Sequence, residues 1–367
     1  VDEHGDQVTY VELEHQIERC ALRWSALGIK RGDVVGVLDT NSTAFVVHLF
    51  GLARLQAVPA LLNWRLTPVE HRSLFDLIQP AAIVSSQNLI NQLPSNLPPI
   101  RIALHSDEEC PPTWVPDSTE FIDGDLPPPP RPGDVFALGF SSGTTGRAKG
   151  IPLRHEALAR SALIDSAENA GMYLGARHIM VAPMFHLAGL SNSLMGLVNG
   201  AELHLRGGFN PESILDDIEQ LGAVYMTAVP AMFRAMVDAA RTQTKAPDLS
   251  SMLEMSYGAS PIAPELLREV ETLFPRVRLR QFYGMTEIAG ALTTLTPTDH
   301  NSSSAHRQSA GRVNPGFEVR LVDRHGREVI DGQPGEILVR GSSVLHNYWD
   351  DPEATKEAII DGWFRTG

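Results

Sequence analysis

The chain has 367 residues, 43% of them hydrophobic and 20% charged, and a formal net charge of −14 at pH 7. This length and composition predict two or three domains with a large core, and the negative charge argues against nucleic acid as the main partner. Only two cysteines are present and no run approaches the roughly 18 apolar residues of a membrane span, so we expect a cytoplasmic protein without a transmembrane segment.

Apolar residues at three- and four-residue spacing predict an amphipathic helix over 13–27, ended by Gly28. The elements expected next are strands over 34–38, 57–61 and 82–84 and helices over 44–56 and 67–77, the last with a capping box at Thr67 and Glu70. This alternation predicts a mostly parallel α/β sheet. A proline-rich stretch over 94–132 lacks periodicity and is expected to be an extended connector.

A strand expected over 134–140 leads into Ser141-Ser-Gly-Thr-Thr-Gly-Arg-Ala-Lys-Gly150. Glycines let backbone N–H groups approach an anion and the lysine adds positive charge, so this loop suits a polyphosphate. A plain surface loop is the simplest alternative. A Walker loop does not fit, because no hydroxyl residue follows Lys149.

The residues Gly139-Phe-Ser-Ser-Gly143 also match the G-x-S-x-G nucleophile elbow of serine hydrolases, with Ser141 as the nucleophile. That motif needs a helix directly after the serine. Gly146, Gly150 and Pro152 make this stretch a poor helix start, so a hydrolase is kept as an alternative function.

The run from Ser141 to Gly150 resembles the phosphate loop of the adenylate-forming superfamily, which includes acyl-CoA synthetases, peptide-synthetase adenylation domains and luciferases; Ala148 replaces the usual proline. Tyr283-Gly-Met-Thr-Glu287 is similar to a second signature of this superfamily. From the residues alone, Tyr283 can stack on a base, Thr286 can bond a phosphate, and Glu287 offers a hard oxygen ligand to Mg²⁺. The runs over 335–341 and 361–367 resemble two further signatures.

The resemblance implies an acyl-CoA synthetase N-terminal fold of stacked, mostly parallel α/β sheets with a small antiparallel β subdomain. We expect the α/β body, with two sheet subdomains, over residues 1–290 and a small β-barrel-like subdomain over 291–367. In this family a C-terminal lid domain follows, and nothing in this chain can stand for it.

The resemblance also implies ATP-dependent activation of a fatty or aryl acid to acyl-AMP, with release of pyrophosphate, and then thioester formation with coenzyme A. His186 stands where amino-acid-activating members carry an aspartate. Since an unpaired buried ammonium group is costly, we rank an acid without an amino group above an amino acid.

The site residues that the resemblance implies fall into four groups. The phosphates are assigned to Ser141, Ser142, Gly143, Thr144, Thr145, Gly146 and Lys149, and adenine to Gly258, Ala259, Ser260 and Tyr283. The acyl pocket is assigned to His186, Thr227, Gly284 and Met285. The catalytic residues are His186, Thr286 and Glu287, with Glu287 also the metal ligand.

The implied cofactors and cosubstrates are ATP, Mg²⁺ and coenzyme A. Besides the hydrolase, a non-catalytic nucleotide-binding protein stays an alternative. The sequence does not decide the acid, the acceptor thiol (coenzyme A or a carrier protein) or the oligomeric state, for which a homodimer is one option.

Overall fold

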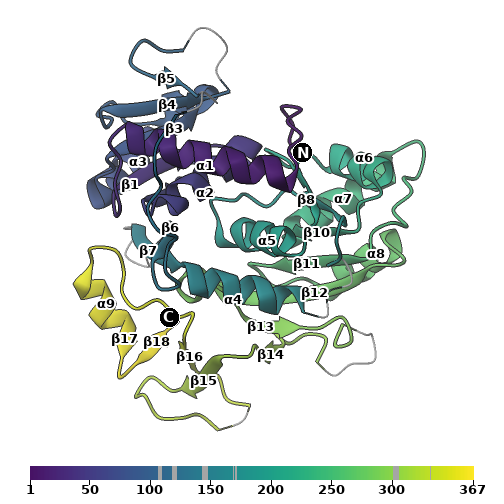
Figure 1. The fold of residues 1–367 in the computed structure, drawn as a ribbon. Coiled ribbons are helices and arrows are strands. Elements are labelled where there is room, and N and C mark those ends of the chain that lie inside the picture. The colour runs from purple at the N-terminus through teal and green to yellow at the C-terminus, as the bar shows by residue number, and fades with distance from the viewer. Residues whose placement is uncertain are drawn as a thin grey trace. The chain divides into compact units, whose positions relative to one another are not determined.

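The computed structural model describes residues 1–105, 110–117, 122–142, 148–167, 169, 172–300, 306–330 and 332–367, with only the backbone of Ser142. The chain divides into two compact units. The first unit comprises Val1–Glu156, Met180–Leu190 and Leu203–Gly208, and the second comprises Ala157–Ile179, Ser191–Glu202 and Phe209–Gly367. Figure 1 shows the helices and strands of the chain, which form three sheets.

The first unit contains a seven-stranded sheet with the order β5-β4-β3-β1-β2-β6-β7. Its strands are β1 (Val34–Leu38), β2 (Val58–Leu61), β3 (Ala82–Ser86), β4 (Ile100–Leu104), β5 (Val115–Pro116), β6 (Val135–Ser142) and β7 (Ala148–Arg154). All neighbours are parallel except β6 and β7. The predicted strands over 34–38, 57–61, 82–84 and 134–140 are confirmed.

Three helices of the first unit match the predicted ones; two begin within one residue of the prediction, and the first begins at Tyr10, three residues earlier than predicted. They are α1 (Tyr10–Ala26), α2 (Thr43–Arg54) and α3 (Pro68–Ile78). The Thr67 and Glu70 side chains form the predicted capping box of α3, and the Ser42 hydroxyl accepts a hydrogen bond from Phe45 N at the start of α2. These caps satisfy backbone N–H groups that a helix start leaves without a partner. A short 3₁₀-helix, η1 (Gln87–Gln92), follows β3.

The prediction of an extended connector over 94–132 is wrong at β4. This strand pairs in parallel with β3, and Ile102, Ala103 and Leu104 are fully buried. A short apolar run between prolines can therefore form a strand of the sheet, because a strand distant in sequence supplies its hydrogen bonds. Local periodicity does not reveal such a partner.

The second seven-stranded sheet has the order β14-β13-β12-β11-β10-β8-β9. Its strands are β8 (Arg177–Met180), β9 (Glu202–Leu205), β10 (Tyr225–Ala228), β11 (Glu254–Gly258), β12 (Arg278–Met285), β13 (Gly290–Leu295) and β14 (Arg312–Val313). β8, β10, β11 and β12 are parallel, whereas β13 and β14 continue the sheet antiparallel.

The remaining helices connect or follow these strands. They are α4 (His155–Ser166), α5 (Leu187–Val198), α6 (Pro211–Leu221), α7 (Pro230–Thr242), α8 (Pro264–Leu273) and the 3₁₀-helix η2 (Thr286–Ile288). Five of the helices, α3, α6, α7, α8 and α9 (Pro352–Ala358), begin with proline, whose missing N–H costs nothing in the first turn. The parallel strands therefore alternate with helices, as expected for an α/β sheet.

A third sheet of four antiparallel strands has the order β15-β16-β18-β17. Its strands are β15 (Phe317–Val322), β16 (Glu336–Gly341), β17 (Ile359–Ile360) and β18 (Trp363–Arg365), with helix α9 (Pro352–Ala358) before β17. The predicted fold class, two mostly parallel sheets plus a small antiparallel sheet, is confirmed. The predicted boundary at residue 290 stays a prediction, although β13 and β14 beyond it extend the second sheet.

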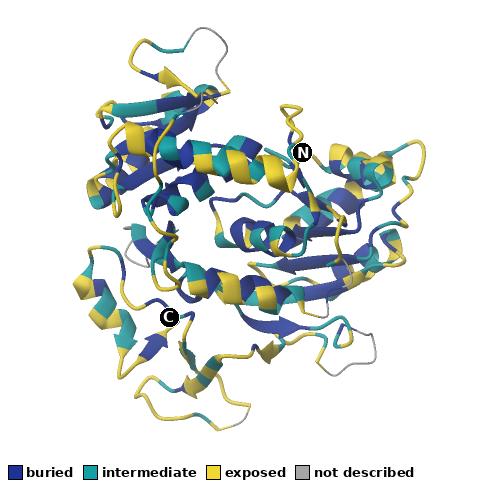
Figure 2. Cartoon of the chain, viewed as in Figure 1, coloured by how far each residue is buried: buried dark blue, intermediate teal, exposed yellow. Residues whose placement is uncertain are grey.

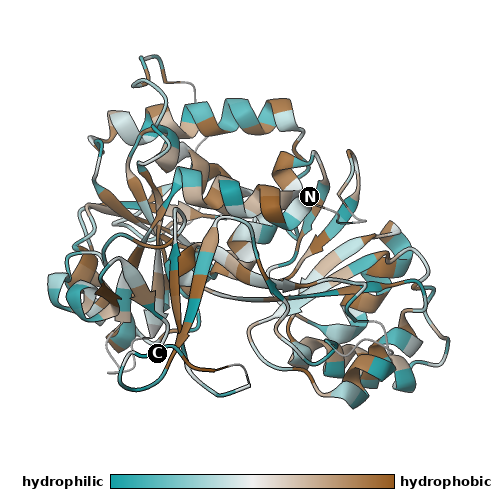
Figure 3. Cartoon of the chain, turned by 90° about the horizontal axis from the view of Figure 1, so that it is seen from below, coloured by the Kyte–Doolittle hydropathy of each residue, from teal (hydrophilic) through white to brown (hydrophobic). Residues whose placement is uncertain are grey.

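Most residues in the strands of the two large sheets are buried. Figure 2 shows β10 and β11 almost entirely buried, whereas α9 is largely exposed. Hydrophobic residues recur along the strands in Figure 3, and hydrophilic residues along the helices. Among the helices in the described part of the chain, none combines the length and apolar character needed to cross a bilayer.

Candidate active site

The predicted phosphate loop lies between two antiparallel strands of the first unit. Ser141 pairs with Lys149 and Ser142 with Ala148, so the strand ends carry a hydroxyl and an ammonium group opposite each other. Gly143, Thr144, Thr145 and Gly146 lie outside the described residues, as does the Ser142 side chain. Ser142, directly after Ser141, still belongs to β6, whereas a hydrolase elbow requires a helix to begin there.

His186 also belongs to the first unit, just before α5. Its ring lies 4.5 Å from the Phe185 ring, which in turn meets Trp64 edge to face. Arg65 lies over the Trp64 ring, 4.7 Å from its centroid. Partial desolvation and the positive charge of Arg65 lower the pKa of His186, so its imidazole is neutral near pH 7.

A cavity of about 540 Å³ opens in the second unit at the carboxyl ends of β11 and β12. Parallel α/β sheets commonly bind ligands at this end of their strands. The cavity brings together the predicted adenine residues Ala259, Ser260 and Tyr283. Gly284, which was predicted for the acyl pocket, lines the same cavity.

Two backbone features shape the wall of this cavity. Gly258 ends β11 so close to β12 that an added Cβ would lie 2.5 Å from the Phe282 carbonyl oxygen. Ala259 has a φ of 68°, which is uncommon for a residue with a Cβ and is found preferentially at functional sites. Gly258 therefore lets β11 lie close to β12, and Ala259 turns the chain directly beside the cavity.

Four further residues that line the cavity were not indicated by the motifs. Gln281 precedes the predicted Tyr-Gly motif, and Arg307, Gln308 and Ser309 precede β14. Arg307 is held in place by two hydrogen bonds to the Glu271 carboxylate and one to the His300 carbonyl. Gln281 could have been predicted as a site residue, because it is a polar side chain on the strand that ends in the Tyr-Gly motif. The segment 307–309 could not, because no sequence pattern links it to β12.

Glu287 is buried in the second unit, on the 3₁₀-helix η2 directly after β12. Its carboxylate accepts a hydrogen bond from the Tyr348 hydroxyl at 3.3 Å, and its backbone carbonyl accepts one from Leu345 N. Thr286, beside it, is partly exposed. Met285 packs, with Tyr283, against Ile288, Leu292 and Val339.

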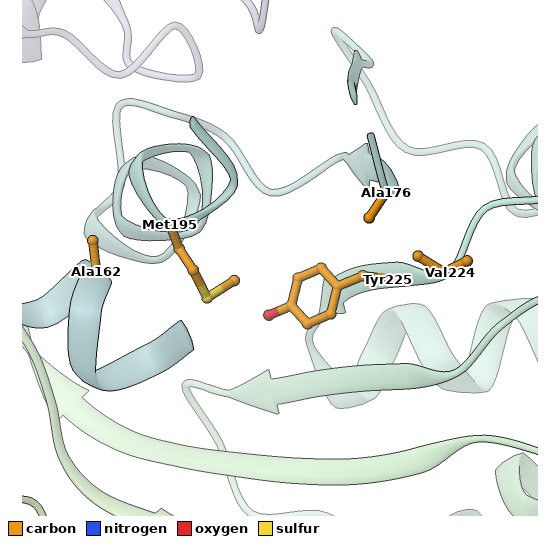
Figure 4. Packing of buried hydrophobic residues seen from close by; sticks show 5 residues of the cluster. All are labelled: Ala162, Ala176, Met195, Val224 and Tyr225. Atoms are coloured by element: carbon orange, nitrogen blue, oxygen red, sulfur yellow. The ribbon is translucent and has the colours of Figure 1, made fainter. Parts of the chain in front are cut away.

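Thr227 lies in a buried polar network instead of the cavity wall. Its hydroxyl is 2.6 Å from both the Asn192 amide oxygen and the Ser256 hydroxyl, and Tyr225 contacts the same two groups at 2.7 Å. Figure 4 shows the Tyr225 ring among the apolar residues around it, with its hydroxyl end on the side of Met195. Of the four predicted acyl residues, Thr227 thus lies in this network and Gly284 lines the cavity. Met285 packs against Ile288, and His186 belongs to the first unit.

No group of three or more His, Cys, Asp and Glu side chains within the described ranges is arranged to hold a metal ion. Magnesium does not require such a group, since it is often bound by one or two carboxylates together with substrate phosphates and water. A single buried carboxylate next to a threonine hydroxyl, as at Glu287 and Thr286, fits that mode.

Comparison with known proteins agrees with this geometry. The model of the family described as "AMP-binding enzyme" matches residues 1–349. The chain is 33% identical over 368 residues to the indoleacetate–CoA ligase of Aromatoleum aromaticum, covering 98% of this chain and 70% of that protein. It is 31% identical to a feruloyl-CoA synthase of Amycolatopsis sp, covering 99% of this chain and 71% of that one.

Among solved structures, the fold matches a long-chain-fatty-acid–CoA ligase from Archaeoglobus fulgidus with a TM-score of 0.86 at 24% identity. The match covers the whole of this chain and 77% of that structure. The chain thus spans about 70% of the length of the curated relatives named above.

Proposed function

Since this chain belongs to the AMP-binding enzyme family, we propose that it joins an aromatic or arylacetic acid to coenzyme A in two ATP-dependent steps. In the first step the carboxylate attacks the α-phosphate of ATP, giving an acyl-adenylate and pyrophosphate. In the second the thiol of coenzyme A attacks the acyl carbon and AMP leaves. Support for an aromatic acid comes from the relatives named for indoleacetate and ferulate.

One observation carries the proposal: Ala259, Ser260 and Tyr283, assigned to adenine from sequence, line one cavity although two separate segments supply them. A turn of small residues and a tyrosine ring suit a flat base that stacks on one face and meets backbone at its edge. The cavity volume of about 540 Å³ is within the range of small-molecule sites.

The first step needs no nucleophile from the protein, so catalysis rests on positioning and charge stabilisation. In this proposal Ser141, Lys149 and the loop between them hold the β- and γ-phosphates, and the Thr286 hydroxyl bonds the α-phosphate. The neutral imidazole of His186 orients the substrate carboxylate without competing for a proton.

Magnesium, when bound, neutralises phosphate charge, and Glu287 is the residue proposed to hold it. Because Tyr348 bonds this carboxylate, the free rotation of the Glu287 side chain is limited before any ligand binds. We propose the cytoplasm as the location, since ATP and coenzyme A are available there and both cysteines are free thiols.

The test is acid-dependent exchange of pyrophosphate into ATP by the full-length enzyme, with aryl, arylacetic, fatty and amino acids and with coenzyme A or a carrier protein as acceptor. Exchange with an aryl or arylacetic acid is the expected result. ATP binding without exchange for any acid would instead indicate a non-catalytic nucleotide-binding protein.

A further inference from the structure

In the first unit, a cysteine, a histidine and an aspartate form a hydrogen-bonded chain, which we call the Cys20–His48–Asp117 triad. The Cys20 sulfur lies 3.6 Å from His48 Nδ1, and His48 Nε2 lies 3.3 Å from Asp117 Oδ2. Cys20 is on α1, His48 is on α2, and Asp117 directly follows β5. Three separate segments thus bring together a thiol, an imidazole and a carboxylate, the groups from which proteins build a nucleophile with its base.

The carboxylate of Asp117 is held in place from its other side. Its Oδ1 accepts a hydrogen bond from the Arg23 guanidinium, which also donates to the Pro116 carbonyl oxygen over 2.7 Å. The parallel pairing of β4 with β5 fixes the backbone of this segment. Asp117 can therefore orient His48, as the third group of a nucleophile–base pair does.

The position of the hydrogen on His48 follows from its two neighbours. The Trp24 indole N–H, which can only donate, lies 3.1 Å from Nδ1, so Nδ1 is an acceptor. The ring hydrogen is then on Nε2, where the Asp117 carboxylate accepts it. The lone pair of Nδ1 therefore faces the Cys20 thiol as well as Trp24, and it can take the proton that the thiol gives up.

Transfer of this proton from Cys20 to His48 is favoured by the charges around the imidazole. Burial alone would lower the pKa of His48, but a negative charge on Cys20 and the Asp117 carboxylate raise this pKa above its ordinary value. In the transferred state the buried Trp24 N–H loses its acceptor on Nδ1, which is costly and favours return of the proton. The triad thus rests as a thiol with a neutral imidazole, and His48 acts as a base during an attack by the sulfur.

We propose that Cys20 is a modification site at which a small hydroperoxide oxidises the thiol, with His48 as the base and Asp117 as the residue that positions it. The sulfur attacks the outer peroxide oxygen, so that an S–O bond forms and the O–O bond breaks. Sulfur gives two electrons to the peroxide, and the leaving oxygen takes the thiol proton from His48 Nδ1. The products are a Cys20 sulfenic acid and water, or an alcohol where the peroxide is organic.

This site is separate from the proposed ligase chemistry, because the triad belongs to the first unit and the adenine cavity to the second. Cys20 is 8% exposed, which restricts the reagent to a small one. α1 and α2 approach so closely here that a Cβ added at Gly51 would lie 2.7 Å from the Cys20 sulfur. An oxygen on the sulfur must displace such neighbours, so we expect oxidation to lower Tm by several degrees.

The experiment measures sulfenic acid formation by hydrogen peroxide in the full-length protein, with dimedone as the trap and mass spectrometry as the readout at each cysteine. A buried thiol without a base reacts more slowly in the folded protein than in urea, whereas a positioned base contributes about 100- to 10 000-fold. We therefore expect Cys20 to react at least about tenfold faster in the folded protein. Cys110, which is partly exposed, is the internal control and should show no such gain.

His48→Gln removes the base and should abolish the folded-state gain at Cys20. Asp117→Asn changes a partly exposed residue and should reduce the gain at least about tenfold. Because a loosened core would speed the reaction of Cys20, a decrease in these variants identifies the base. His15→Gln, at an exposed histidine, is the matched control. A lower rate at Cys20 in the folded than in the unfolded natural protein, or an undiminished gain in His48→Gln, would overturn the proposal.

Discussion

The hydroxyl of Tyr348 donates a hydrogen bond to the carboxylate of Glu287 over 3.3 Å, and both groups are buried. Burial and the negative charge of Glu287 raise the pKa of Tyr348, so the phenol remains a donor at neutral pH. The tyrosine therefore fixes one oxygen of the carboxylate and with it the orientation of the Glu287 side chain.

We expect Tyr348→Phe to raise the magnesium concentration for half-maximal pyrophosphate exchange about tenfold, because loss of a group that orients a metal ligand weakens metal binding by about 10- to 100-fold. The measurement is a magnesium titration at saturating ATP. Tyr10→Phe, at an exposed tyrosine, is the control. An unchanged titration in Tyr348→Phe would remove Glu287 from the metal site.

Lys149→Met removes the positive side chain that pairs opposite Ser141, beside the predicted phosphate loop. A charged hydrogen bond contributes about 1.5–3 kcal/mol, so we expect the KM for ATP to rise at least tenfold. The Kd for AMP should change less than twofold, because AMP lacks the β- and γ-phosphates. Calorimetry with AMP and exchange kinetics with ATP measure the two. Lys30→Met, on an exposed turn, should alter neither. Equal losses for AMP and ATP would contradict the phosphate assignment.

Gly284→Ala tests how tightly β12 and β13 approach each other beside the cavity. An added Cβ would lie 2.1 Å from the Gly290 carbonyl oxygen, and backbone cannot move aside as a flexible side chain can. Overpacking of this kind costs about 1–3 kcal/mol, so we expect Tm to fall by several degrees and AMP binding to weaken. Gly208→Ala is the control, since nothing lies within 4 Å of the added atom. Equal Tm values for the two variants would mean that the backbone around Gly284 moves aside without cost.

Asp165, on α4, is a buried carboxyl whose Oδ1 has no hydrogen-bond partner in the described part of the chain. Burial raises its pKa from 3.8 to about 7, although the Ser161 hydroxyl and Arg280 act against the rise. The folded protein thus holds a proton that the unfolded chain releases above pH 3.8, so this contribution to stability is lost as the pH rises toward 7.

Asp165→Asn keeps the shape of the neutral acid and cannot ionise. We expect its free energy of unfolding to exceed that of the natural protein at pH 8 by up to about 4 kcal/mol, and the two to converge near pH 4. Urea unfolding at several pH values measures this, with the exposed Asp125→Asn as control. If Asp165→Asn were instead less stable than the natural protein, and by more at pH 8 than at pH 4, the ionised carboxylate and Arg280 would stabilise each other.

The elements that were predicted best are those whose sequence patterns lie within the element itself or next to it. The capping box of α3 and the alternation of buried strands with helices depend on residues within a few positions of one another. β4 was missed because its stability comes from pairing with β3, which no local pattern records. The same division holds at the cavity: Ala259 and Tyr283 belong to recognisable motifs, whereas Arg307 reaches it only through the antiparallel extension of the second sheet.

Thr227 illustrates a different limit. Its place at the carboxyl end of β10 was foreseeable, but its hydroxyl turns toward Asn192 and Ser256. The hydrogen-bond partner of the Thr227 hydroxyl depends on the helix that supplies Asn192, which is α5. The sequence did not predict a helix over 187–198.

The first sheet has a proline in each of its outermost strands, Pro116 in β5 and Pro152 in β7. A proline has no N–H to offer, so at each edge the row of exposed donors is interrupted. An incoming strand from another molecule would find an incomplete template on either side, which protects a concentrated protein against edge-to-edge aggregation. The sheet that carries the predicted phosphate loop therefore also resists growing beyond its own seven strands.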